Sequence, residues 1–312
     1  MRIFVFSYNR GRYLRNCLVS LHRHAPADAR VTVIDDGSAD PAVQATLQEY
    51  AGWCDAVVAD TDSRMYLGGL YANMQHALET VTASDPVLFI QDDMQVVRDI
   101  GPRDLDHWRR FFDRHPQSFE LYGCFIKSKQ VTTRRQKFLI EHETPVYFRD
   151  PNTSRRAFFS AVGIFRLDRM RNAGWVFEAS EGENNARARE HEAYMGLTPY
   201  PFMMWLPNAE SAKFRHRGLI QRYAEWRAGV GFHPYEPMSH AQVEWLWQRP
   251  VDELPVAEHL LAPHGLAAAQ DWLFEDATKA IKPLHRVMKR IKKRQVAAFQ
   301  RKTEKPRQRG GN

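Results

Sequence analysis

Two adjacent carboxylates follow an apolar run in "PVLFIQDDM" (86–94), and their residue types and spacing suit cation chemistry. Val87 to Ile90 are typical of a strand buried on both faces, so Asp92 and Asp93 come where that strand leaves the sheet. Two carboxylates about 5 Å apart repel by roughly 3 kcal/mol at an effective dielectric near 20. A shared Mg²⁺ or Mn²⁺ would turn this repulsion into binding, because hard oxygen ligands suit both ions. The alternative is a capped or solvated loop after a strand.

A second acidic pair lies in "VIDDGSADP" (33–41). Asp40 precedes a proline and is expected to cap a helix, with the proline at the first helical position. Asp36 lies beside a Gly-Ser turn and has no evident structural role. Its carboxylate could accept a hydrogen bond from the N–H of a uracil or guanine ring.

Polar residues also follow the first expected strand, in "FSYNRGRYL" (6–14). Ser7 and Tyr8 come directly after it, where a base could stack on Tyr8. Arg10 and Arg12 could contact phosphates, or they could be ordinary surface arginines at the start of a helix.

The elements that must position these residues alternate regularly over the first ninety residues. Strands are expected at 2–7, 31–35, 56–59 and 86–91, with helices between them. This β-α-β-α-β-α-β order predicts a doubly wound, mostly parallel sheet, whose ligands bind outside the carboxyl ends of the strands. Three polar motifs would therefore share one edge. After residue 100 we expect a helix, a strand, a hairpin and a strand followed by a short helix, then long loops over 178–245.

As an ordered set, "SYNR…YL", "DDGS", "LYANMQHAL" and "QDDM" resemble the family 2 glycosyltransferases with the GT-A fold. The resemblance is close over 1–100 and looser over 160–220. It implies an α/β fold with a mostly parallel nucleotide-binding sheet flanked by helices, followed by an acceptor-side subregion. It also implies sugar transfer from a nucleoside-diphosphate donor to a hydroxyl of a saccharide or lipid-linked acceptor, with Mn²⁺ or Mg²⁺ and with inversion.

The resemblance assigns roles position by position. The expected nucleotide-binding residues are Ser7, Tyr8, Arg12, Asp36, Arg64 and Asp92. Within this set Tyr8 and Asp36 would hold the base, Arg64 a phosphate, and Asp92 the ribose or donor sugar. Asp93 would bind the metal ion. Gln91 replaces an acid at the first position of the DxD-like motif, and this difference weakens the expected affinity for the metal ion.

For the catalytic base the resemblance points to an acid in "AGWVFEASEGENNARAREHEAYM" (173–195). Glu183 stands nearest the expected place, and its rivals are Glu181, Glu190 and Glu192, although the last two also suit the charged face of an ordinary helix. A base must reach the acceptor hydroxyl, which a sequence does not establish. His216, between two arginines in "FRHRG", is a candidate metal or diphosphate ligand, the alternative being a surface histidine.

Charge is distributed unevenly along the 312 residues. From residue 277 onward there are thirteen basic residues and one acidic residue, a net charge of +12, whereas the rest has 31 basic and 36 acidic residues, a net charge of −5. The mildly acidic body argues against a general nucleic-acid-binding surface. Residues 277–302 predict a basic amphipathic helix that suits an anionic membrane surface. The alternatives are a nucleic-acid-binding tail and a helix packed on its own domain.

From these patterns we expect a transferase domain over 1–250 (donor half 1–100, acceptor half 101–250), a helical extension over 251–276 and a basic helix and tail over 277–312. Three cysteines at scattered spacing indicate reduced, mostly buried thiols. The expected location is therefore the cytoplasm, peripheral to the membrane if the tail binds lipid. Two alternatives stay open: a sugar nucleotidyltransferase, which would need a Gly-rich loop after the first strand, and a non-catalytic nucleotide-sugar-binding protein of the same fold.

Overall fold

The computed structural model describes residues 1–58, 69–82, 84–210, 218–266 and 271–277. The chain divides into two compact units, one of Met1–Leu206 with Pro234–His264 and the other of Pro207–His233 with Gly265–Asn312. The expected linear boundaries at 250 and 276 stay predictions. Arg64, His216 and the basic segment that follows Ala277 lie outside the described residues, so their predicted roles stay predictions too.

The first four strands form the parallel part of a central sheet, in the order β3-β2-β1-β4. These strands are β1 (Arg2–Ser7), β2 (Arg30–Asp35), β3 (Cys54–Val58) and β4 (Val87–Gln91). The helices between them are α1 (Gly11–His24), α2 (Pro41–Glu49) and α3 (Leu70–Thr80). The predicted alternation of strands and helices is therefore confirmed, and the apolar runs of β1 and β4 are buried as expected.

Beyond β4 the sheet is mixed, with the order β4-β9-β6-β10-β8-β7 completing nine strands. The added strands are β9 (Gly163–Phe165), β6 (Glu120–Tyr122), β10 (Gly196–Leu197), β8 (Val146–Arg149) and β7 (Phe138–Glu141). A separate two-stranded sheet pairs β5 (Met94–Val96) with β11 (Met203–Trp205) in antiparallel register. The α/β class predicted from the sequence is confirmed.

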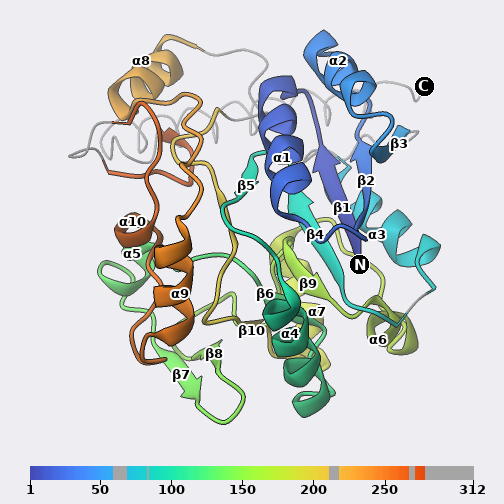
Figure 1. The fold of residues 1–312 in the computed structure, drawn as a ribbon, viewed down its shortest axis with the longest axis vertical. Coiled ribbons are helices and arrows are strands. Elements are labelled where there is room, and N and C mark those ends of the chain that lie inside the picture. Colours follow the sequence, from blue (N-terminus) through green and yellow to red (C-terminus); the bar gives the residue numbers. More distant parts are fainter. Residues whose placement is uncertain (59–68, 83, 211–217, 267–270, 278–312) are drawn as a thin grey trace, which may run out of the picture. The chain divides into compact units, whose positions relative to one another are not determined.

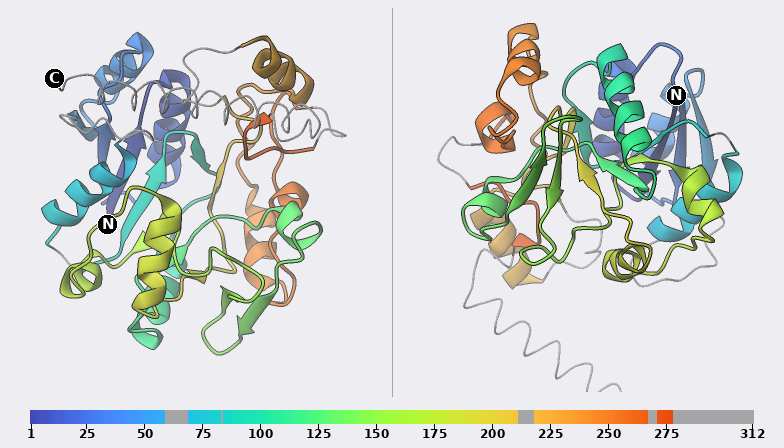
Figure 2. Two further views of the ribbon diagram at one scale, coloured as in Figure 1. Left: turned by 180° about the vertical axis from the view of Figure 1, so that it is seen from behind. Right: turned by 90° about the horizontal axis from the view of Figure 1, so that it is seen from below.

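Helices cover both faces of the central sheet (Figures 1 and 2). α1, α2 and α4 (Pro102–Arg114) lie over one face, and α3, α6 (Leu167–Asn172) and α7 (Glu181–Glu190) lie over the other. On the second face alternate strand residues form an aromatic core, in which Phe6 and Phe89 meet edge to face at 5.2 Å. Burial of these large rings provides much of the driving force that fixes the strands that end at the polar edge.

The prediction of long loops over 178–245 is wrong. This segment contains α7, β10, β11, α8 (Leu219–Ala228) and α9 (His240–Gln248). α7 shows little apolar periodicity because its buried side chains include Asn184 and Asn185, and it begins at the capping residue Ser180. β10 and β11 have two and three residues, too few for a visible alternation.

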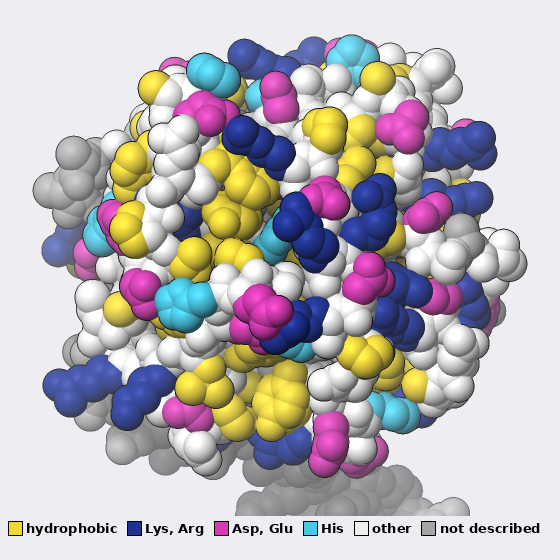
Figure 3. Space-filling view, turned by 60° about the horizontal axis from the view of Figure 1, so that its bottom comes forward, with side chains coloured by type: hydrophobic (Ala, Val, Ile, Leu, Met, Phe, Trp, Pro, Cys, Tyr) yellow, Lys and Arg dark blue, Asp and Glu magenta, His cyan; other side chains and the backbone are white. Residues whose placement is uncertain are grey.

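The remaining short elements are α5 (Ser128–Val131) and α10 (Ala257–Leu260), and α10 is the helix found in the described part of 251–276. Cys17, Cys54 and Cys124 are free and buried, as expected. Among the described helices, none is both long and apolar enough to cross a membrane. On the face drawn in Figure 3, acidic and basic side chains are interspersed.

Candidate functional site

The candidate site lies at the carboxyl ends of β1, β2 and β4. β1 pairs in parallel with both neighbours, so that Ser7 lies opposite Asp35 and Phe6 opposite Gln91. The strand order reverses between β1 and β4, which is where open α/β sheets bind ligands. Neighbouring strands lie about 4.8 Å apart, so the segments after β2 and β4 are separated by roughly 10 Å, a distance that one extended ligand can span.

Asp92 and Asp93 form the tight turn between β4 and β5, and Arg10 holds them together. One guanidinium nitrogen of Arg10 donates to Asp93 Oδ2 at 2.8 Å, and the other donates to Asp92 Oδ1. The backbone N–H of Tyr8 donates to Asp92 Oδ2 at 3.1 Å. Burial raises the pKa of Asp92 to about 6, and Arg10 opposes that rise. The repulsion between these carboxylates is therefore offset by an arginine.

Asp36 and its neighbour Asp35 have different environments. Asp35 accepts two hydrogen bonds from Ser38, from the backbone N–H at 2.8 Å and from the hydroxyl at 2.5 Å, and thereby closes the turn after β2. Asp36 Oδ2 accepts from the backbone N–H of Gly69 at 2.5 Å. Burial raises the pKa of Asp36, and the Gly69 hydrogen bond opposes the rise. Asp35 is thus a structural residue, whereas Asp36, which also interacts with the Asn73 side chain, retains Oδ1 for another partner.

Asn9 ties the loops after β1 and β2 to each other. It has a positive φ of 51°, a conformation that asparagine tolerates better than most residues. Its amide oxygen accepts from the backbone N–H groups of Ala39 and Asp40, and its own N–H donates to Ser38 Oγ at 2.8 Å. Asp40 caps α2 as predicted and also accepts from the N–H of Gly11 at 2.9 Å. These bonds fix the backbone on which Tyr8, Arg10 and Asp36 stand.

Four buried polar atoms at this edge have no hydrogen-bond partner among the described residues. They are Ser7 Oγ, Arg10 Nε, Asp36 Oδ1 and Asp93 Oδ1. A buried polar group without a partner costs about 1–3 kcal/mol, so such groups are rare unless a ligand, ion or water completes them. Twelve buried side-chain polar atoms of the described residues lack a hydrogen-bond partner, and these four lie together at the carboxyl ends of three adjacent strands, which makes this edge the candidate binding site.

The small β5–β11 sheet adds a wall beside the carboxylates. The backbone N–H of Leu206 donates to the Asp93 carbonyl at 2.8 Å, which places Trp205 next to the turn. The Lys127 ammonium lies 4.3 Å from the centre of the Trp205 ring, a cation–π contact. Burial lowers the pKa of Lys127 to about 8. An aromatic ring and a cation therefore border the site on the side away from Asp36.

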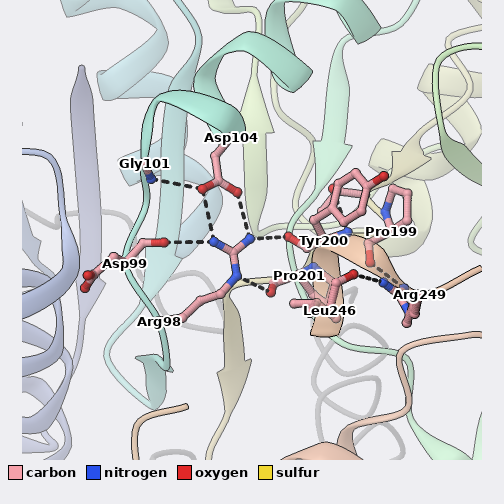
Figure 4. A network of polar contacts seen from close by, with 10 residues as sticks. Arg98, Asp99, Gly101, Asp104, Pro199, Tyr200, Pro201, Leu246 and Arg249 are labelled. Carbon is pink, nitrogen blue, oxygen red and sulfur yellow. Dashed lines mark hydrogen bonds and ion pairs between the residues drawn. The ribbon is translucent and has the colours of Figure 1, made fainter. Parts of the chain in front are cut away.

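Arg98 fixes the segment that leads into β11 (Figure 4). All five of its N–H donors are used: it makes a two-point contact with the Asp104 carboxylate, and it donates to the carbonyls of Asp99, Tyr200 and Pro201. Arg98 is 2% exposed and Asp104 is 2% exposed. The position of the Trp205 wall thus depends on a buried, fully satisfied ion pair that lies away from the site.

Other predicted residues lie elsewhere. Arg12 is exposed in the first turn of α1, with its guanidinium 5.5 Å from the Tyr13 ring centre. Glu183 is exposed near the start of α7, where its carboxylate accepts a hydrogen bond from the Ser180 hydroxyl at 2.7 Å. Its rival Glu181 is half-buried and lies 3.5 Å from Arg156. Neither glutamate is among the contacts that join the three strand ends, but Glu181 is close enough to Lys127 to interact with it electrostatically.

Sequence reasoning missed Lys127 and Trp205 and left the role of Arg10 open between phosphate contact and surface. Arg10 had a local signal, since it follows a buried strand by three residues. Lys127 and Trp205 had none, because only the pairing of two three-residue strands brings Trp205 to the Asp93 turn. Predicted Ser7, Tyr8, Asp36, Asp92 and Asp93 do meet at one edge.

The described residues offer one carboxylate oxygen suited to a divalent cation, Asp93 Oδ1. They contain no cluster of three or more His, Cys, Asp or Glu side chains arranged to hold a metal ion. Mg²⁺, however, needs only one or two carboxylates when it binds together with substrate phosphates. Asp93 Oδ1 is buried without a partner in the described structure and is suited to be such a ligand.

Comparison with known proteins gives a family match over the strands that build this site. The sequence model of the family described as "Glycosyl transferase family 2" matches residues 2–166. No curated protein matches the chain by sequence.

Solved structures give further similarities. Staphylococcus aureus TarS 1–349 in complex with UDP is 16% identical, with a TM-score of 0.46 over 65% of this chain and 59% of that chain. Mannosyltransferase PcManGT from Pyrobaculum calidifontis, in complex with GDP-Man and Mn²⁺, is 15% identical, with a TM-score of 0.41 over 73% of this chain and 61% of that chain. Mouse xyloside xylosyltransferase 1 is 13% identical, with a TM-score of 0.35 over 62% of this chain and 76% of that chain. The chain thus spans about three fifths of the first two proteins.

Proposed function

The chain belongs to glycosyl transferase family 2, and we propose that it moves a sugar from a nucleoside-diphosphate donor to a hydroxyl group of a saccharide or lipid-linked acceptor. The observation that carries this proposal is the set of four unpartnered buried polar atoms at the ends of β1, β2 and β4. A nucleoside diphosphate offers N–H donors at one end and phosphate oxygens at the other. This polarity suits a site with a carboxylate at one end and a cation at the other.

In the proposed complex Asp36 Oδ1 accepts a hydrogen bond from a base N–H, and Tyr8 packs on the base. Asp92 faces the ribose or the donor sugar. Arg10 has one unpartnered N–H at Nε, which is suited to a diphosphate oxygen. Because the loops that carry these residues are tied together by Asn9, binding requires little reorganisation, and little binding energy is lost to ordering.

Asp93 is the proposed metal ligand, with His216 a second ligand on the sequence evidence alone. A divalent cation held there would supply positive charge that stabilises the departing diphosphate. The chain's own contribution is to hold Asp93 in place, through the Leu206 N–H on its carbonyl and the Arg10 guanidinium on its carboxylate.

For an inverting transfer the acceptor hydroxyl must lose its proton to a base. Glu183 is the base proposed from the sequence, and Glu181 is a second candidate because it is less exposed than Glu183 and lies on the same helix start. Either carboxylate must reach the acceptor, so Glu181→Gln and Glu183→Gln are to be compared directly. Loss of turnover with unchanged donor binding in only one of them identifies the base.

The proposal is tested by nucleoside-diphosphate release from a panel of UDP-, GDP-, CDP- and dTDP-sugars, with and without Mn²⁺. We expect one donor class to be turned over and Asp93→Asn to abolish the signal. Asp55→Asn, at an exposed carboxylate of β3, serves as the matched control and should keep full activity. Turnover that survives in Asp93→Asn would contradict the assigned site, and a folded protein that hydrolyses or transfers from none of the donors would contradict the function.

A further inference from the structure

Helix α8 of the second compact unit has two chemically different faces. Its small residues Ala224 and Ala228 are buried and pack with Ala277, with Val230 and Leu273 beside them. The opposite face carries large apolar and aromatic side chains in the open: Leu219 is 84% exposed, Trp226 75% and Tyr223 50%. These are large side chains to leave in water on a ten-residue helix.

The exposed residues form one continuous stripe. Leu219, Tyr223 and Trp226 stand at spacings of four and three, so they lie one above another on the helix surface. The rings of Tyr223 and Trp226 are neighbours, with their centres 5.9 Å apart. Arg222 and Arg227 are exposed and, at about 100° per residue, flank the stripe on its two sides. The pattern is an apolar centre with a cation on each edge.

We propose that this stripe docks on the surface of an anionic lipid membrane, with Leu219, Tyr223 and Trp226 at the acyl boundary and both arginines on headgroup phosphates. Tyr and Trp are the residues enriched at such interfaces, because their rings are apolar and their polar tips remain hydrated. Arginine side chains beside the stripe can reach the phosphates while their methylene stems lie along the apolar surface.

The sequence of the unit that contains α8 is rich in basic residues, which favours lipid over a protein partner as the occupant. Its two segments, Pro207–His233 and Gly265–Asn312, hold eighteen basic and six acidic residues, a net charge of +12, while the rest of the chain has a net charge of −5. The only acid of α8, Glu225, lies on the buried side. Sixteen of the eighteen basic residues lie outside the described residues, and Arg222 and Arg227 are the two described ones that an anionic surface would attract. This inference does not depend on the donor site or on the proposed transfer.

Exposed apolar residues elsewhere give a matched control. Leu139 is 57% exposed and Val176 is 52% exposed, and they lie in β7 and in the segment before α7. Neither belongs to a stripe with flanking arginines. Scattered exposed apolar side chains of this kind are normal in soluble proteins.

The test is co-sedimentation of the full chain with phosphatidylcholine vesicles that contain or lack phosphatidylglycerol. We expect binding to the anionic vesicles, weaker by more than about tenfold in Leu219→Ser/Trp226→Ser and by about fivefold for each of Arg222→Gln and Arg227→Gln. Leu139→Ser/Val176→Ser should bind like the wild type, and thermal melting should show all variants folded. Undiminished binding of Leu219→Ser/Trp226→Ser to anionic vesicles would overturn the proposal.

Quenching by brominated lipid gives a second, independent readout. Trp226→Phe keeps the stripe apolar but removes its indole, so vesicle binding should persist while quenching of tryptophan fluorescence falls sharply. Equal quenching in Trp226→Phe and the wild type would show that α8 does not enter the lipid. Sedimentation velocity completes the test: if Leu219→Ser/Trp226→Ser breaks a dimer and leaves vesicle binding intact, the stripe is an interface between copies and the lipid proposal is wrong.

Discussion

Replacing Arg10 by glutamine should destabilise the ligand-free protein, because this arginine offsets the charges of two neighbouring carboxylates. Side-chain exposure is 16% for Arg10, 1% for Asp92 and 18% for Asp93. Removing one partner of a buried ion pair costs about 3–5 kcal/mol. Because Arg10 and Asp93 keep some contact with water, we expect the lower end, about 3 kcal/mol, which corresponds to a fall in Tm of roughly 6–12 °C.

The assay is differential scanning calorimetry near neutral pH, with Arg12→Gln as the matched control. Arg12 is two residues away, and its side chain is exposed against the Tyr13 ring, so its replacement should change the free energy of unfolding by less than about 0.5 kcal/mol. At a pH of about 5 the loss in Arg10→Gln should shrink, since Asp92 is protonated below its raised pKa.

Divalent cations give the same prediction a second readout. Mn²⁺ should raise the Tm of Arg10→Gln more than that of the wild type, because the two carboxylates are then left without their arginine. Equal melting of Arg10→Gln and Arg12→Gln would refute the ion-pair argument. A destabilised Arg10→Gln that Mn²⁺ does not rescue would refute the view that the two carboxylates can share a cation.

Three further predictions follow from individual contacts. Arg98→Ala should lower the free energy of unfolding by about 3–5 kcal/mol in urea, because Asp104 stays buried without its partner, whereas Arg103→Ala, at an exposed pair, should change it by less than about 1 kcal/mol. Burial of Asp92 favours its protonated form in the folded wild type. The free energy of unfolding that Asp92 contributes is therefore fully present below its unfolded pKa of 3.8 and is lost as the pH rises through about 6. Asp92→Asn should remove this pH dependence from calorimetric melts. Asp36→Asn should weaken nucleotide binding in calorimetric titration by about tenfold to a hundredfold, because a charged hydrogen bond is worth about 1.5–3 kcal/mol, and unchanged affinity would remove Asp36 from the base site.

The edge formed by the ends of β1, β2 and β4 is predictable from the sequence because it depends on local order. Each strand of the parallel part is a short apolar run, and each polar motif follows its strand directly, so the shared edge follows from the alternation of strands and helices alone. The cap at Asp40 has a local signal in the proline that follows it, and the structure has the hydrogen bond from Ala42 N–H to Asp40 Oδ1 at 3.0 Å.

The Trp205 wall and helix α7 depend on long-range contacts and are poorly predictable from the sequence. Trp205 reaches Asp93 through a pairing of strands more than a hundred residues apart, and Lys127 reaches Trp205 from a third segment. α7 is a polar helix whose buried side chains include asparagines, so a pattern of apolar residues does not predict it. The two possible partners of the Asp92–Asp93 pair, a metal ion and an arginine, have the same charge sign. The two carboxylates alone therefore do not distinguish between them, and the structure has the arginine.

The central claim is that the ends of β1, β2 and β4 form one nucleoside-diphosphate site completed by a cation. The most direct test is calorimetric titration of the full chain with UDP, GDP, CDP and dTDP, with and without Mn²⁺, in the wild type and in Asp93→Asn. We expect one nucleotide to bind, Mn²⁺ to strengthen its binding, and Asp93→Asn to remove the Mn²⁺ effect while the protein stays folded. Absence of binding for all four nucleotides, or a Mn²⁺ effect that persists in Asp93→Asn, would contradict it.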